Sequence, residues 1–117
     1  MSQQRAQLNS IAYGVILLAA ITALIHLYLS LQFPNGPDFA FLLNGIGYLV
    51  LVGAIYAPIP LLARYRSLFC WLLIAYTTLT IVLWFFFGAN SWSAYIDKAV
   101  EIALIFLLWL ETRRLSE

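Results

Sequence analysis

The chain has 117 residues, of which 64% are hydrophobic and 9% are charged, and its formal net charge is +1. A typical soluble domain is about 45–50% apolar and about 25% charged, and six basic and five acidic side chains are too few to cover the surface of a water-soluble globule. The composition argues against a soluble enzyme, a disordered chain and a nucleic-acid-binding surface. It predicts an integral membrane protein.

The first apolar run, residues 11–33, is long enough for a membrane-spanning helix, which needs about 20 residues. Asn9 and Ser10 precede it as candidate N-caps. The segment FPNGP at 33–37 ends it, because proline and glycine do not continue a helix. The run is longer than the apolar part of a signal peptide, about 7–15 residues, and we expect a retained span.

Three further apolar runs follow at 39–61, 67–87 and 94–112. The second starts after the capping residue Asp38, and Pro58 and Pro60 stop or kink it near its far end. The third ends at GAN, 88–90. The fourth is followed by polar residues from Glu111 onward, which we expect to face water. The connections are short, so we predict one all-α domain, an antiparallel up-down-up-down four-helix bundle over 1–117.

Lysine and arginine placement predicts the orientation of this bundle. Cytoplasmic loops of membrane proteins carry an excess of these residues, and five of the six fall on one side of the predicted topology: Arg5, Arg64, Arg66, Arg113 and Arg114. We therefore expect both termini in the cytoplasm and the protein in the plasma (inner) membrane.

Polar side chains recur at helical spacing within every predicted span. Residues three or four apart share one face of a helix, and at about 1.5 Å per residue these groups fall in one layer beneath the non-cytoplasmic boundary. The first span contributes Thr22, His26 and Ser30 to such a face. The candidate ligand-binding cluster consists of His26, Asn44, Tyr48, Thr80, Trp84, Asp97, Lys98 and Glu101.

Each member of this layer also has a purely structural interpretation. His26 and Asn44 are the kind of side chain that hydrogen-bonds between membrane helices. Asp97 and Lys98 are close to a predicted helix start, where an acid is favourable and a lysine snorkels outward. Glu101 lies deeper, so Lys98 or His26 neutralises it or it takes up a proton.

The sequence contains no GxSxG, HExxH, CxxC or CxxCH motif, and it has a single cysteine, Cys70. One histidine and one cysteine do not make a usual structural zinc site. We expect a non-enzyme without a metal, and no cofactor is required. Haem ligation by His26, or a quinone near His26, Tyr48 and Trp84, remains open.

Three short segments carry a resemblance: IHLYL at 25–29, FLLNGIGY at 41–48 and DKAV at 97–100. With these segments the chain resembles an uncharacterised family of short prokaryotic four-helix membrane proteins. The resemblance implies the same architecture and marks His26 and the Asp97-Lys98 pair as characteristic. It implies no activity, and Asn44 departs from the small residue expected in the second span.

Besides a cofactor-binding module, the sequence is compatible with two other functional classes. The first is a non-enzymatic accessory subunit of a larger respiratory or photosynthetic membrane complex, or a homo-oligomer surrounded by lipid. The second is a small proton- or ion-coupled transporter that uses the polar layer, for which four spans would require more than one copy.

Overall fold

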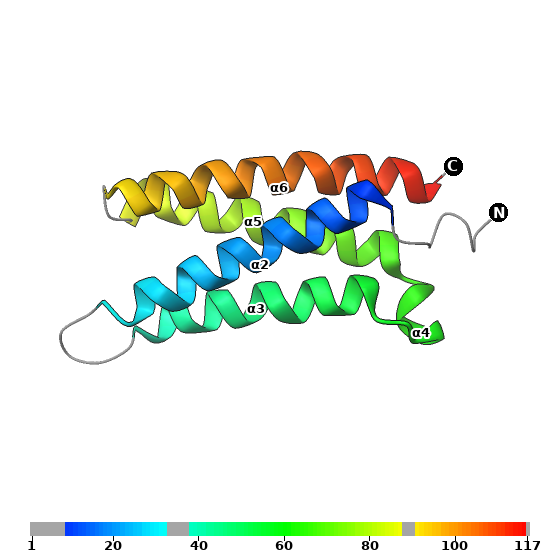
Figure 1. Cartoon of the computed structure of the whole chain (residues 1–117), viewed down its shortest axis with the longest axis horizontal. Coiled ribbons are helices and arrows are strands. Elements are labelled where there is room, and N and C mark those ends of the chain that lie inside the picture. Colours follow the sequence, from blue (N-terminus) through cyan, green and yellow to red (C-terminus); the bar gives the residue numbers. More distant parts are fainter. Residues whose placement is uncertain (1–8, 33–37, 88–90, 117) are drawn as a thin grey trace.

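The structure is a computed structural model that describes residues 9–32, 38–87 and 91–116. These residues form five helices and no strand, which confirms the all-α class. Figure 1 shows the helices in chain order: α2 (Ser10–Ser30), α3 (Phe39–Tyr56), α4 (Pro60–Ala63), α5 (Arg66–Phe87) and α6 (Trp92–Ser116).

The helix starts follow from local capping. The Asn9 side chain accepts a hydrogen bond from the Ala12 amide at 3.0 Å, and Asp38 accepts one from the Phe41 amide at 3.1 Å. Both bonds satisfy amides that have no partner within their own helix, as the sequence predicts for these two caps. Pro60 stands in the first turn of the short helix α4, where a missing amide hydrogen costs nothing. The predicted breaks at 33–37 and 88–90, and Arg5, lie outside the described residues.

Three helices are long and apolar enough to cross a membrane: α2, α3 and Arg66–Phe86 of α5. Helix α6 is the longest helix that the structure describes, with 25 residues, but it is not among the three. The reason lies in its charged residues, including Asp97, Lys98 and Glu101, which the sequence places in its first half.

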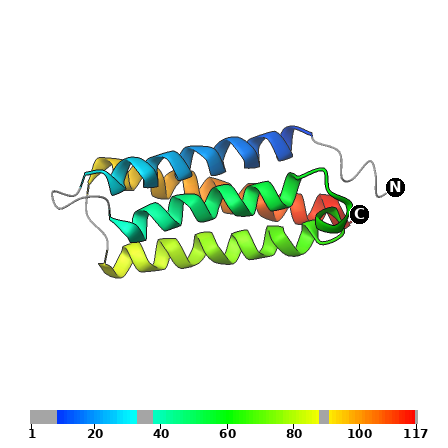
Figure 2. The same cartoon turned by 90° about the horizontal axis from the view of Figure 1, so that it is seen from below.

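The four long helices run side by side (Figures 1 and 2). Helix α2 packs against α3 and α6, and α5 packs against α3 and α6. Buried apolar side chains along the middle of the molecule include Val15, Ala19, Leu73, Leu104 and Leu108. Along the helices, this apolar core lies on the α4 side of the site described next, and it holds the four helices together.

Helices α2 and α3 approach closely at Gly45. A Cβ atom at this position would lie 2.9 Å from the backbone oxygen of Ala23 and 3.1 Å from the Leu27 side chain. The absence of a side chain at Gly45 therefore lets the two backbones meet, a role that small residues have between membrane helices.

Candidate functional site

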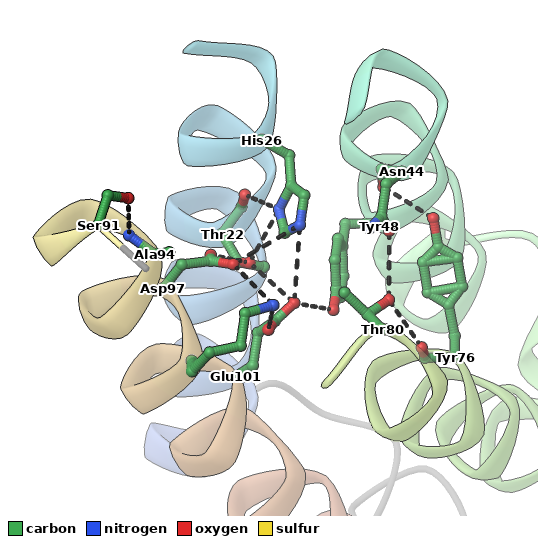
Figure 3. Close-up of polar contacts among 11 residues, drawn as sticks. Thr22, His26, Asn44, Tyr48, Tyr76, Thr80, Ser91, Ala94, Asp97 and Glu101 are labelled. Atoms are coloured by element: carbon green, nitrogen blue, oxygen red, sulfur yellow. Dashed lines mark hydrogen bonds and ion pairs between the residues drawn. The ribbon is translucent and has the colours of Figure 1, made fainter. Parts of the chain in front are cut away.

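Six buried side chains from three helices meet in one place, which we call the acid–base cluster. Figure 3 shows Thr22 and His26 of α2 facing Asp97 and Glu101 of α6, with Tyr48 of α3 closing the other side. Lys98 of α6 is the sixth member and contacts both acids. The exposed fraction is 1% for His26, 1% for Asp97, 0% for Glu101 and 7% for Lys98. These four residues are thus almost fully buried.

Glu101 receives a donor on each carboxylate oxygen. The Tyr48 hydroxyl donates to Oε2 at 2.5 Å, and the Lys98 ammonium donates to Oε1, also at 2.5 Å. A buried carboxylate requires such partners because it has lost its water. The bond from Tyr48 joins α3 to α6.

Asp97 is held by α2 and by its sequence neighbour. The Thr22 hydroxyl donates to Oδ1 at 2.6 Å, and Lys98 Nζ lies 3.2 Å from Oδ2. Lys98 therefore bridges the two carboxylates from within the protein. The outward, snorkelling orientation considered for Lys98 is wrong, because its ammonium is directed at the two buried acids.

The two ring nitrogens of His26 have different surroundings. Nδ1 lies 2.8 Å from the Thr22 carbonyl oxygen, a pure acceptor, so Nδ1 carries a hydrogen and donates it. Nε2 lies 3.6 Å from Asp97 Oδ2 and 3.9 Å from Glu101 Oε2. Both nitrogens thus face groups of the protein. A haem iron could bind a ring nitrogen only by displacing the group that this nitrogen faces.

Asn44 and Thr80 form a second polar contact beside the cluster, together with Tyr76. Tyr76 donates its hydroxyl hydrogen to the backbone oxygen of Asn44 at 2.8 Å. Thr80 Oγ1 lies 3.4 Å from the side-chain oxygen Oδ1 of Asn44. The Tyr76 ring meets the Tyr48 ring edge-on, with 4.9 Å between the centroids. This contact therefore attaches α5 to the cluster through aromatic packing.

A cavity of about 700 Å³ opens next to the cluster. His26, Asp97 and Lys98 form its charged side, and Asn44 and Thr80 add uncharged polar groups. The remaining wall is largely apolar or aromatic and includes Phe41, Leu43, Tyr76, Leu79, Leu83 and Trp84.

Trp84 lies on the boundary between the charged and the aromatic wall of the cavity. Lys98 Nζ is 5.9 Å from the centroid of its ring, within the range of a cation–π contact. All eight residues that the sequence analysis singled out thus lie in the cluster, in the adjoining contact or on the cavity wall.

The geometry of His26, Asp97 and Glu101 also resembles a metal-binding arrangement. One donor atom from each lies within 4.8 Å of the others. Lys98, however, already places a positive charge between the two carboxylates. A metal ion would have to displace or neutralise this ammonium, so the arrangement is an internal ion network rather than an open metal site.

A third buried carboxylate, Glu111, lies near the other end of α6. Tyr56 donates its hydroxyl hydrogen to Glu111 Oε2 at 2.5 Å, and Arg114 Nε donates to Oε1 at 2.6 Å. The hydrogen bond between Arg114 and Glu111 raises the pKa of the Arg114 guanidinium above its usual range. The interpretation of Glu111 as a water-facing residue is wrong, since its exposed fraction is 0%.

Two contributors to the site were absent from the candidate set. Thr22 shares a helix face with His26, and its spacing of four residues was the available signal. Tyr76 stands four residues before Thr80 and offered the same signal. Neither spacing reveals which acid or carbonyl the hydroxyl reaches, because that depends on helix rotation.

Comparison with known proteins gives no relative: no protein-family model, no curated protein and no solved structure matches the chain. The class of protein therefore rests on the fold and the site. The described part of the chain is an all-helical protein with three helices capable of crossing a membrane.

Proposed function

We propose that the protein is an integral protein of the plasma membrane in which α2, α3, α5 and α6 all span the bilayer as a four-helix bundle. Helix α6 supports this despite its charges. Asp97, Lys98 and Glu101 are buried, whereas Ile102, Phe106 and other large apolar residues of α6 are exposed. Ionisable groups that face the interior and pair with one another are the form in which membranes tolerate them.

The proposed orientation places both termini in the cytoplasm. Arg64 and Arg66 follow α4 and begin α5, and Arg113 and Arg114 lie near the end of α6. All four therefore lie at the same end of the antiparallel arrangement, as the positive-inside rule requires. The acid–base cluster and the cavity then belong to the non-cytoplasmic half.

Within this framework we propose a binding function without catalysis. The observation that carries it is the cavity, whose wall is apolar and aromatic apart from a few convergent polar groups. This combination is typical of small-molecule sites, where the apolar wall supplies affinity and the polar groups fix the orientation. A ligand that enters from lipid would contact His26, Asp97 and Lys98 with its polar end.

The geometry favours a flat, lipophilic carbonyl compound of the quinone type. Lys98 has three ammonium hydrogens, of which the bonds to the two acids use two. A carbonyl oxygen is the natural acceptor for the third. Trp84, Phe41 and Tyr76 supply aromatic surfaces on the cavity wall, which stack well against a flat ring.

Binding is better supported than conduction across the membrane. Glu101 and Glu111 are the buried carboxylates nearest to the two ends of the apolar core, and they stand ten positions apart on α6, about 15 Å. Leu73, Leu104 and Leu108 fill the core between them and are fully buried. No polar side chain of the cluster is hydrogen-bonded to the Glu111 group among the described residues.

The test measures binding of a short-chain quinone to protein in lipid nanodiscs by isothermal titration calorimetry. Ala40 lines the cavity and is exposed, so Ala40→Trp fills the cavity without displacing the core. We expect one ligand per chain and at least tenfold weaker binding by Ala40→Trp.

Ala75→Trp is the matched control, because Ala75 is also exposed but does not line the cavity. Its affinity should equal that of the wild type. Absence of binding to the wild type, or equal weakening in both variants, would refute the proposed site.

A further inference from the structure

The acid–base cluster has one positive charge too few. Asp97 and Glu101 contribute two negative charges, and Lys98 contributes one positive charge. With a neutral His26 the sum is −1, although all four residues are at most 7% exposed. A net charge buried in a membrane protein is costly, and it is normally removed by a counter-charge or by a proton.

The contacts of the cluster favour one position for this missing charge. The two acids already receive hydrogens from Thr22, Tyr48 and Lys98. His26 Nδ1 is engaged with the Thr22 carbonyl oxygen. His26 Nε2 is the remaining ring nitrogen, and it faces both carboxylates at 3.6 and 3.9 Å.

We propose that the cluster is a binding site for one exchangeable proton, held on His26 Nε2 between Asp97 and Glu101. With the proton bound, the His26 imidazolium and the Lys98 ammonium balance the two carboxylates. A divalent metal ion in the same place would leave an excess of one positive charge beside the Lys98 ammonium, so the charge balance favours the proton.

The groups that surround His26 agree with this assignment. Helix α3 contributes the rings of Tyr48 and Phe41, whose centroids lie 5.7 and 6.0 Å from that of the imidazole. From α5 the nearest titratable group is Tyr76, whose hydroxyl donates to the Asn44 carbonyl oxygen. The other charged groups are the α6 residues already counted, and His26, Asp97 and Lys98 also line the cavity, which gives a proton its route.

The proton site shares His26, Asp97 and Lys98 with the proposed ligand site, but its test needs no ligand. The proton can be observed directly because His26 is the only histidine of the chain. Protein labelled with ¹⁵N-histidine is placed in nanodiscs, and nitrogen NMR spectra are recorded between pH 5 and pH 10. We expect both ring nitrogens protonated at pH 7, and the loss of one proton from Nε2 at higher pH. A neutral ring throughout the range, or a stoichiometric metal ion found by elemental analysis, would overturn the proposal.

Two variants test the charge count. Asp97→Asn removes one negative charge, so Lys98 alone balances Glu101 and His26 should be neutral at pH 7. Glu111→Gln removes a buried carboxylate of the same helix, outside the cluster, and should leave the His26 spectrum unchanged. A wild-type-like imidazolium in Asp97→Asn would contradict the proposal, and the wild-type spectrum remains decisive if that variant does not fold.

Discussion

At the scale of single residues, the site is governed by how each buried charge is compensated. Lys98 lies within ion-pair distance of both acids, at 3.2 Å from Asp97 and 2.5 Å from Glu101. Removing one partner of a buried pair leaves the other charge without compensation, which costs more than the pair itself gains. Variants of this cluster should therefore be strongly coupled.

Lys98→Met should destabilise the protein by about 3–5 kcal/mol, because two buried carboxylates lose their shared cation. The double variant Lys98→Met, Glu101→Gln removes one positive and one negative charge together and should recover a large part of this loss. Reversible unfolding in detergent measures both. A double variant that is less stable than Lys98→Met would contradict the charge argument.

Thr22→Val should cost about 1–3 kcal/mol, because Asp97 Oδ1 loses the hydroxyl donor at 2.6 Å while it remains buried. Thr22→Ser retains the hydroxyl and serves as the control in the same unfolding measurement. Equal stability of the valine variant and the wild type would show that this hydrogen bond is unimportant.

At the scale of helices, the sequence predicts where helices begin better than it predicts which side chains meet between them. Asn9 and Asp38 are recognisable as caps because capping depends on a few neighbouring residues. The contact of Tyr56 with Glu111 joins residues on α3 and α6 and depends on the rotation of both helices. Spacing alone does not fix this rotation, since apolar residues cover almost every face of these helices.

Gly45 and Gly53 of α3 provide a matched pair of positions. Gly45→Ala places a Cβ 2.9 Å from the Ala23 backbone oxygen and should separate α2 from α3, with a loss of about 1–3 kcal/mol. Gly53→Ala meets nothing within 4 Å and should be neutral or should stabilise α3 by up to about 1 kcal/mol. Thermal unfolding distinguishes the two, and the reverse order would contradict the described packing.

At the scale of the whole molecule, the shared level of the polar groups along the helices could be predicted, but their partners could not. Counting residues from the predicted span ends places His26, Asp97 and Glu101 at similar depth, and the structure brings them together. The same count places Asn44 in this layer, but its contacts are with Tyr76 and Thr80 rather than with the charges. The position along a helix follows from the rise per residue, whereas the partners follow from packing.

The proposed topology predicts which positions react from outside the cell. Gln32→Cys lies just beyond the end of α2, on the non-cytoplasmic side, and should react with a membrane-impermeant maleimide in intact cells. Tyr65→Cys, exposed between α4 and α5, should react only after permeabilisation. The native Cys70 is buried and provides the unlabelled background. Labelling of both positions in intact cells would rule out this orientation.

A double-mutant cycle across α3 and α6 measures the contact between Tyr48 and Glu101 directly. The cluster joins these two helices through the Tyr48 hydroxyl and the Glu101 carboxylate, which lie 2.5 Å apart. Unfolding free energies are measured in bilayers for Tyr48→Phe, Glu101→Leu and the double variant, because each single change removes the hydrogen bond. We expect a coupling energy of about 1 kcal/mol, whereas additivity within about 0.3 kcal/mol, as for distant sites, would contradict the account.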